Sequence, residues 1–311
     1  MCDSNFEHKP VLLLQCIEGL NIRPGGSYLD GTAGGAGHSL EIAKRLGSGG
    51  RLYCTDKDGA AIETATARLK GYPNASVASG DYKDAKAIFG LAENSMDGAL
   101  LDLGVSSHQL DSAERGFSYN KEGLLDMRMS GAGQTAADMV NTLEWWQLAD
   151  IIRQYGEEPN AVPIARKIVS EREKQAITST LTLSDIIVSA VPASVRRKEK
   201  HPARRTFQAL RIAVNDELGV LREGLENIFE LLAPGGRFCV ISFHSIEDRI
   251  VKQFFAGLQQ GCTCPPDFPQ CVCGNKPKAK AISKKPVTAS QEECETNRRA
   301  RSAKLRIVEK L

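Results

Sequence analysis

A glycine-rich segment near the N-terminus has the composition of a ligand-binding loop. It reads Asp30-Gly31-Thr32-Ala33-Gly34-Gly35-Ala36-Gly37-His38, between an apolar run and a stretch of helical spacing. Glycines let the backbone turn tightly and approach a ligand closely, and a helix start offers free N–H groups, so the segment predicts a nucleotide-like ligand. The spacing does not complete the dinucleotide fingerprint, because His38 and the residues after it replace the third small residue. A glycine-rich connection without a ligand is the alternative.

Acidic residues stand at the ends of the following apolar runs. Asp56 lies about twenty residues past the loop, where doubly wound folds hold the hydroxyls of a ribose. Its alternative role is to cap a helix that begins near Asp58. Asp81-Tyr82 ends the third run and Asp102 the fourth, so four successive runs end in acidic or polar groups. This row predicts the crevice at which open α/β sheets bind ligands, although each acid alone could be a cap or turn residue.

Four cysteines near the C-terminus could hold a metal. Cys262, Cys264, Cys271 and Cys273 lie within twelve residues, and four thiolates can bind zinc tetrahedrally. The C-x-C spacing is less usual than C-x₂-C, and prolines separate the two pairs. The sequence therefore favours a reduced loop, and we assign no metal site.

Two other pairs of residues have both a functional and a structural interpretation. His244 and Asp248 follow an apolar run and could face the same crevice, but Ser, His, Glu and Asp before a helix are also capping residues. Trp145-Trp146 could stack on bases, although at least one of the two is expected in a hydrophobic core.

Strand-like and helix-like segments alternate along the first hundred residues. Apolar runs at residues 27–31, 51–56, 75–78 and 97–104 alternate with helical spacings at 39–46 and 60–69. This pattern predicts βαβ units and a parallel sheet. Helical patterns follow at 143–155, 162–173, 182–191 and 202–232, before a strand at 236–243, a helix at 246–258 and a strand at 303–310. We expect an α/β fold with a Rossmann-like, mostly parallel sheet (residues 1–110 and 212–311) and an inserted helical domain (111–211).

Composition and charge narrow the class of protein. With 41% hydrophobic and 25% charged residues, the chain is expected to fold, and no stretch approaches the roughly 18 apolar residues of a membrane span. The N-terminus lacks the apolar core of a secretory signal, so a cytoplasmic protein is expected. The net charge of +2 hides two basic segments, 160–211 and 252–311, each with seven more Lys/Arg than Asp/Glu. They indicate a polyanionic partner, unless they are only solvated faces.

The longer motifs resemble one enzyme family. The glycine loop, Asp56 and Asp81-Tyr82 are similar to those of class I S-adenosylmethionine-dependent methyltransferases. Ordered segments over the whole chain resemble the bacterial 16S ribosomal RNA cytosine-N4 methyltransferases of the RsmH or MraW type. These segments lie at residues 8–13, 30–39, 101–107, 114–119, 125–129, 155–158, 201–211, 241–252 and 299–306. The resemblance implies S-adenosylmethionine as cofactor and, as substrate, the N4 amine of a cytidine in the decoding centre of 16S rRNA in the small ribosomal subunit.

The resemblance also implies roles for individual residues. The cofactor contacts fall on Gly35, Ala36, Gly37, His38, Asp56, Tyr82, Asp102 and Gln109. The insertion is expected to hold RNA, with Arg204, Arg205 and Arg211 along one helix as the candidate contacts. The chain departs from the family at several positions, with Ala33 and Ala36 in the loop, Gln15, His108, and prolines at 159 and 163. Whether two copies form a homodimer is left open.

The transfer chemistry assigns a role to Asp102. An exocyclic cytosine amine is a poor nucleophile because its lone pair is delocalised, so the protein must orient it towards a methyl group that the cofactor already activates. Asp102-Leu103-Gly104 stands where amino methyltransferases place an acceptor for the amine hydrogens. The alternative is that Asp102 only braces the loop or the cofactor, and the general base is not identified.

Two other functions compete with this prediction. A nicotinamide-dependent oxidoreductase would share the loop and Asp56, but it would need a full dinucleotide fingerprint and would not explain the two basic segments. A ribosome-assembly factor without catalysis would keep the basic residues, but it would have little need of the whole row of strand-end acids.

Overall fold

The computed structural model describes residues 10–197, 200–264, 270 and 272–311. The chain divides into two compact units, one made of the described residues of Met1–Gly104 and Val220–Leu311 and the other of Val105–Gly219. The units therefore separate at Gly104 and Gly219, where the sequence placed the boundaries at 110 and 211. No helix in the described part of the chain is long and apolar enough to cross a membrane.

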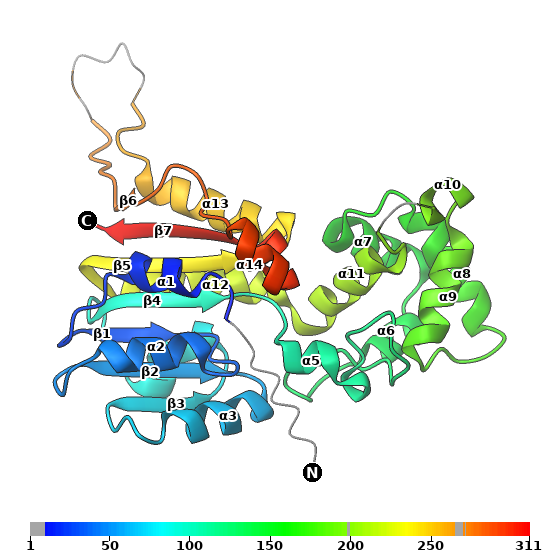
Figure 1. The fold of residues 1–311 in the computed structure, drawn as a ribbon. Coiled ribbons are helices and arrows are strands. Elements are labelled where there is room, and N and C mark those ends of the chain that lie inside the picture. Colours follow the sequence, from blue (N-terminus) through cyan, green and yellow to red (C-terminus); the bar gives the residue numbers. More distant parts are fainter. Residues whose placement is uncertain (1–9, 198–199, 265–269, 271) are drawn as a thin grey trace. The chain divides into compact units, whose positions relative to one another are not determined.

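The first unit is built on a seven-stranded sheet in the order β3-β2-β1-β4-β5-β7-β6 (Figure 1). Its strands are β1 (Ser27–Asp30), β2 (Arg51–Asp56), β3 (Ala75–Ser79), β4 (Met96–Asp102), β5 (Leu232–Ser242), β6 (Ala279–Ala281) and β7 (Lys304–Lys310). Strands β1 to β5 run parallel to one another, whereas β7 is antiparallel to both β5 and β6. The predicted mostly parallel sheet is confirmed, and the short β6 was not predicted.

Helices of the first unit pack on both faces of this sheet. They are α1 (Leu13–Leu20), α2 (Gly37–Arg45), α3 (Gly59–Leu69), α4 (Ala85–Phe89), most of α12 (Glu217–Leu231), α13 (Ser245–Gln259) and α14 (Gln291–Thr296). Cys239 of β5 shares a buried cluster with Cys16 of α1 and Ile42 of α2. The preceding residue, Phe238, faces the other way, and its ring lies 5.8 Å from that of Phe255 on α13. Because side chains alternate along a strand, these contacts place α1 and α2 opposite α13.

The second unit is helical. It contains α5 (Ser107–Asp111), α6 (Ala136–Thr142), α7 (Trp145–Gly156), α8 (Ala161–Arg172), α9 (Thr180–Ala190), α10 (Ala193–Arg196) and α11 (Ala203–Asn215). The apolar faces of four of these helices meet in one core, where Leu148, Ile164, Leu183 and Phe207 are buried together. The prediction of helices at 143–155, 162–173 and 182–191 is confirmed within two residues at each end.

The single long helix expected at 202–232 is wrong. The structure breaks it into α11 and α12 at Asp216, whose φ of 45° and ψ of 41° are left-handed. Its backbone N–H bonds to the carbonyl of Ile212 and so ends α11. Its carboxylate lies against Gly219, where an added Cβ would be 2.4 Å from an oxygen. Aspartate tolerates this conformation better than most residues, and the apolar spacing on either side does not register the break.

Candidate active site

Three carboxylates lie at the carboxyl ends of adjacent strands in the sheet. Asp30, Asp56 and Asp102 are the last residues of β1, β2 and β4, which are neighbouring parallel strands. Asp30 pairs with Cys54 on β2 and with Leu100 on β4, two residues before the ends of those strands. The expected row of strand-end acids is therefore present at one edge of the first unit.

Asp30 anchors the loop that leaves β1. The Asp30 side chain is almost completely buried, accepts a hydrogen bond from the Thr32 N–H (3.1 Å) and another from the Ser39 hydroxyl on α2. Burial raises the pKa of the Asp30 carboxyl above its ordinary value. The side chain thus ties the strand end to the first turns of α2, and its bonds point into the protein.

The glycine loop approaches the sheet more closely than other residues would allow. A Cβ on Gly31 would lie 2.5 Å from Leu101 Cδ2 and 2.7 Å from Tyr82 Cβ, so a side chain there cannot fit. Gly34 has a φ of +49°, and its N–H donates a 2.9 Å hydrogen bond to Asp56 Oδ2. Ala36, one of the positions at which the chain departs from the family it resembles, adopts the same left-handed region with a φ of 57°. The alanine therefore keeps the backbone geometry of the loop.

The Asp56 carboxylate is held by two backbone N–H groups. Oδ2 accepts from Gly34 and Oδ1 accepts from Asp58, both at 2.9 Å. The helix cap of α3 is Asp58, which accepts from the Ala60 N–H, so the alternative that Asp56 is this cap is wrong. Each carboxylate oxygen can accept a second hydrogen bond. Asp56 is therefore oriented by the loop and can still accept from a pair of hydroxyls.

Asp102 carries a buried oxygen that lacks a hydrogen-bond partner. Its backbone N–H is fixed by Thr32 Oγ1 at 2.6 Å, while its Oδ1 has no partner among the described residues. About a fifth of the side chain is exposed. Burial raises the pKa of Asp102 to about 7, although the charge of Arg299 opposes the rise. A buried acceptor of this kind is costly unless a ligand or water supplies a donor, which fits a site for a polar reactant.

His38 turns its side chain into the protein. The ring is buried, its Nε2 is 3.1 Å from the Val11 carbonyl, and its Nδ1 is 3.9 Å from Asp102 Oδ2. Burial lowers the pKa of His38. The position lies in the first turn of α2, so a cofactor contact at His38 would use the backbone N–H rather than the ring.

Tyr82 follows β3 and lies beside the carboxyl ends of the same strands. It begins a short 3₁₀ turn (Tyr82–Asp84) that Asp81 caps. Its ring packs over Gly224 of α12, where an added Cβ would be 2.2 Å from Cε2. The ring therefore has a fixed position beside Gly31 and the end of β1.

Gln109 belongs to the second unit and has a local structural role. Its Oε1 accepts from the Ser106 N–H (2.8 Å), and its own N–H donates to Ser106 Oγ (3.2 Å). The two residues thus cap the start of α5 reciprocally. The predicted cofactor contact of Gln109 remains a prediction.

Arg299 was not among the predicted site residues. It lies in the 3₁₀ turn Arg298–Ser302, its guanidinium is 5.6 Å from the centre of the Phe243 ring, and its charge lowers the pKa of Asp102. The only signal in the sequence was its place at the start of the matching segment 299–306. The capping interpretation fits His244, which caps α13 together with Glu247. Asp248 is not the cap, and its carboxylate pairs with Lys304 and Arg306 at 3.0 and 2.7 Å.

Two expectations about the helical unit need correction. Arg211 makes a bidentate ion pair with Glu217, at 2.8 and 2.9 Å, and its side chain is only 16% exposed, so it is not available to RNA phosphates. Arg204 and Arg205 of the same helix are exposed. Trp145 and Trp146 are not core residues, because they are 37% and 54% exposed. The guanidinium of Arg166 lies 4.7 Å from the Trp145 ring centre.

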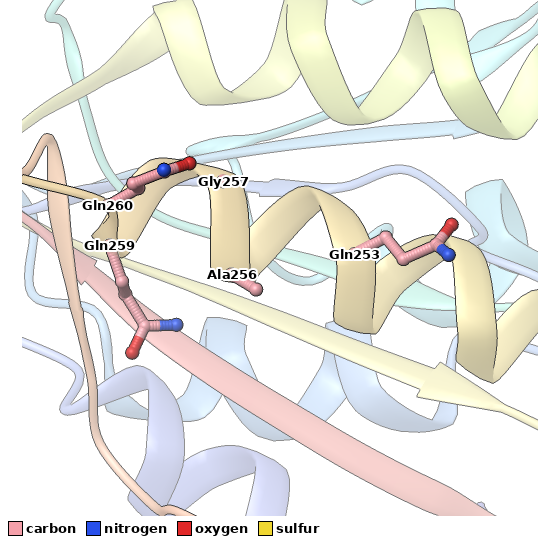
Figure 2. A pocket seen from close by; sticks show the side chains of 5 residues that line it. All are labelled: Gln253, Ala256, Gly257, Gln259 and Gln260. Atoms are coloured by element: carbon pink, nitrogen blue, oxygen red, sulfur yellow. The ribbon is translucent and has the colours of Figure 1, made fainter. Parts of the chain in front are cut away.

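A surface hollow elsewhere in the first unit takes no part in this site. Figure 2 shows its lining along α13, from Gln253 to Gln259 and Gln260 at the end of that helix. The lining residues are glutamines, an alanine and a glycine, without an ionisable side chain. The hollow therefore offers no group for acid–base or transfer chemistry.

The sheet order, its one antiparallel strand β7, the glycine loop after β1 and the carboxylates after β2 and β4 define a class I S-adenosylmethionine-dependent methyltransferase. The residues present fit this methyl donor, because Asp56 retains acceptor capacity and Asp102 has an unsatisfied oxygen among the described residues.

The chain belongs to the MraW methylase family, whose model matches residues 5–311. A ribosomal RNA small subunit methyltransferase H of Ruminiclostridium cellulolyticum is 51% identical over 311 residues, which cover 98% of this chain and 99% of that protein. Its counterpart in Brevibacillus brevis is 50% identical over 314 residues and covers 100% of both chains. A solved rRNA methylase from Streptococcus thermophilus is 11% identical, with a TM-score of 0.45 over 97% of this chain and 98% of that one.

Proposed function

We propose that this enzyme transfers a methyl group from S-adenosylmethionine to the N4 amine of a cytidine in the decoding centre of 16S rRNA. The names of its relatives support an rRNA substrate of the small ribosomal subunit. The observation that carries the chemistry is the buried Asp102 Oδ1, which lacks a hydrogen-bond donor among the described residues. An enzyme with this substrate works in the cytoplasm, where bacterial ribosomes are assembled.

Residues that follow different strands contact different parts of the cofactor. Asp56 accepts the two ribose hydroxyls, because the N–H groups of Gly34 and Asp58 fix the plane of its carboxylate. The backbone of Gly35, Ala36, Gly37 and His38 lies against the amino-acid part of the cofactor, and Tyr82 lies at the adenine.

Asp102 orients the target amine. As a carboxylate it accepts one N–H of the amine, which turns the nitrogen lone pair towards the methyl group. The cofactor supplies a methyl group activated by a positive sulfur. With the cofactor bound, the amine nitrogen would take the methyl group while the C–S bonding pair stayed on sulfur, and one N–H proton would leave to Asp102 or to water. Because the pKa of Asp102 is raised to about 7, the residue can accept that proton near neutral pH.

The helical unit holds RNA. Arg204 and Arg205 at the start of α11 present exposed charges for phosphates. Trp145 and Trp146 at the start of α7 present exposed rings, on which unpaired bases can stack. Helices α7 and α11 pack against each other within this unit, so both kinds of contact are carried by one compact unit.

The test is methyl transfer with the product identified. Small ribosomal subunits and naked 16S rRNA that lack the modification are incubated with enzyme and tritiated S-adenosylmethionine, and the labelled nucleoside is identified by mass spectrometry. The proposal expects N4-methylcytidine at one position. Label on carbon 5 or on a ribose would contradict the assigned chemistry. RNA binding without any label would favour the assembly factor.

A further inference from the structure

Three cysteine thiols meet in the segment between α13 and β6. The Sγ atoms of Cys262, Cys264 and Cys273 all lie within 4.8 Å of one another. The fourth cysteine of the motif, Cys271, lies outside the described residues. The sequence favoured a reduced loop without metal, and the proximity of the three sulfurs calls for a different explanation.

The distances fit a shared ion better than a disulfide. Cys262 Sγ and Cys273 Sγ are 3.7 Å apart. A disulfide requires about 2.05 Å between its sulfurs. Two thiolates on one tetrahedral zinc, each at about 2.3 Å from the ion, lie about 3.8 Å apart. The spacing of this pair therefore matches two corners of a tetrahedral site.

Backbone N–H groups support the sulfurs. The Thr263 N–H donates to Cys273 Sγ at 3.4 Å, and the Val272 N–H donates to Cys264 Sγ at 3.4 Å. Cys273 Sγ also accepts from the Asn275 N–H at 3.5 Å. Such bonds orient metal-bound thiolates and offset part of their negative charge, so the arrangement is that of ligands with a supporting outer shell.

The chain on either side closes the loop at its base. The Lys278 N–H bonds to the Leu258 carbonyl at 2.7 Å, and the Asn275 side chain bonds to the Gly261 carbonyl at 3.0 Å. The two described arms, orange in Figure 1, therefore run side by side between α13 and β6. This base holds the C-x-C pair of one arm opposite Cys273 of the other.

We propose that Cys262, Cys264 and Cys273 bind a thiophilic divalent ion, with zinc as the fitting example. Metal binding deprotonates the thiols that become ligands, and a soft cation of tetrahedral preference offsets the repulsion among three sulfurs this close. The buried cysteines Cys16, Cys54 and Cys239 differ, because burial raises their pKa and keeps them as thiols. The ion fastens the two arms of the loop together and is a structural element outside the strand-end site.

The test titrates the reduced full-length protein with Co²⁺ and then with Zn²⁺. We expect a thiolate-to-cobalt charge-transfer absorption at about one equivalent, which zinc abolishes, as in thiolate-rich sites. With zinc bound, Cys262, Cys264 and Cys273 should resist alkylation, as mapped by mass spectrometry, while Cys294 reacts. Cobalt binding without this absorption, or equal alkylation with and without zinc, would overturn the proposal.

Variants assign the ligands. The triple variant Cys262→Ser, Cys264→Ser, Cys273→Ser should bind zinc at least 100-fold more weakly, with Cys271 retained in every protein. The matched control Cys294→Ser removes a half-exposed cysteine outside the cluster and should bind as the wild type does. Equal zinc affinity of the triple variant and the control would exclude these ligands. The alkylation pattern of the wild type does not depend on whether a variant folds.

Discussion

Asp102 Oδ2 lies 3.9 Å from His38 Nδ1, and the other ring nitrogen of His38 is bonded to the Val11 carbonyl. Because that bond requires the ring proton on Nε2, the neutral imidazole presents a lone pair to the carboxylate. When Asp102 is ionised, two acceptors thus face each other, and His38 does not satisfy the carboxylate. This relationship leaves the Asp102 carboxylate in need of an N–H donor, which the target amine supplies in the proposed complex.

Loss of the Asp56 carboxylate should weaken cofactor binding selectively. Asp56→Ala removes charge-assisted hydrogen bonds to the ribose that are worth roughly 1.5–3 kcal/mol. Isothermal titration with S-adenosylmethionine should show the loss, whereas RNA affinity should stay the same. Unchanged cofactor affinity in a folded variant would remove Asp56 from the site.

Activity should rise with pH through the ionisation of Asp102. Its pKa is raised to about 7, and only the carboxylate form accepts from the amine without first losing a proton. The pH profile of kcat/KM for the wild type should therefore rise through about pH 7, and Asp102→Asn should lack this rise. A wild-type profile that is flat between pH 6 and 8 would contradict this role.

The same ionisation should affect folding stability. Between the ordinary carboxyl pKa of about 4 and the raised value, the folded protein holds a proton that the unfolded chain has released. The free energy of unfolding should therefore fall as pH rises across this window. Asp102→Asn should flatten this dependence in urea unfolding and become more stable than the wild type above pH 7, by on the order of a few kcal/mol at most. If the free energy of unfolding of the variant depended on pH as that of the wild type does, Asp102 would not be the group whose ionisation causes this dependence.

Two arginine variants should separate RNA contact from structure. Replacement of Arg204 and Arg205 by Ala should weaken RNA binding and flatten its salt dependence by about 0.7 per lost contact. Arg211→Ala should leave that slope unchanged but destabilise the fold by roughly 1–3 kcal/mol, because the buried Glu217 carboxylate loses its partner. Filter binding across salt concentrations and urea unfolding measure the two effects. If Arg211→Ala flattened the salt dependence of RNA binding and the Arg204 and Arg205 variant did not, Arg211 would be the residue that contacts RNA.

Trp146 should contribute to RNA affinity by stacking on an unpaired base. Trp146→Ala should cost about 1–3 kcal/mol in RNA affinity, while Trp146→Phe retains a ring and should lose much less. The indole is 54% exposed, so neither change should alter the melting temperature much. Equal RNA affinity of the alanine and phenylalanine variants would exclude a stacking role.

Local patterns predicted the sheet and its strand-end acids, because alternation and glycine loops are readable from neighbouring residues. Contacts between residues far apart in the chain could not be predicted from the sequence. The charge of Arg299, in a turn near the C-terminus, lowers the pKa of Asp102. Arg211 pairs with Glu217 across a helix break that Asp216 introduces. The sequence likewise contains two C-x-C pairs, but their spacing did not predict that Cys262 and Cys273 lie close together.

The most direct test of the proposed mechanism is the single-turnover rate of methyl transfer to the target cytidine by Asp102→Ala, because an asparagine would keep a carbonyl oxygen that can accept from the amine. With saturating S-adenosylmethionine and unmodified small ribosomal subunits, we expect transfer at least 100-fold slower than in the wild type, since orientation of the amine matters in the transition state. Affinity for cofactor and RNA should change little. A variant that transfers the methyl group at the wild-type rate would contradict the assignment of Asp102 as the acceptor that orients the amine.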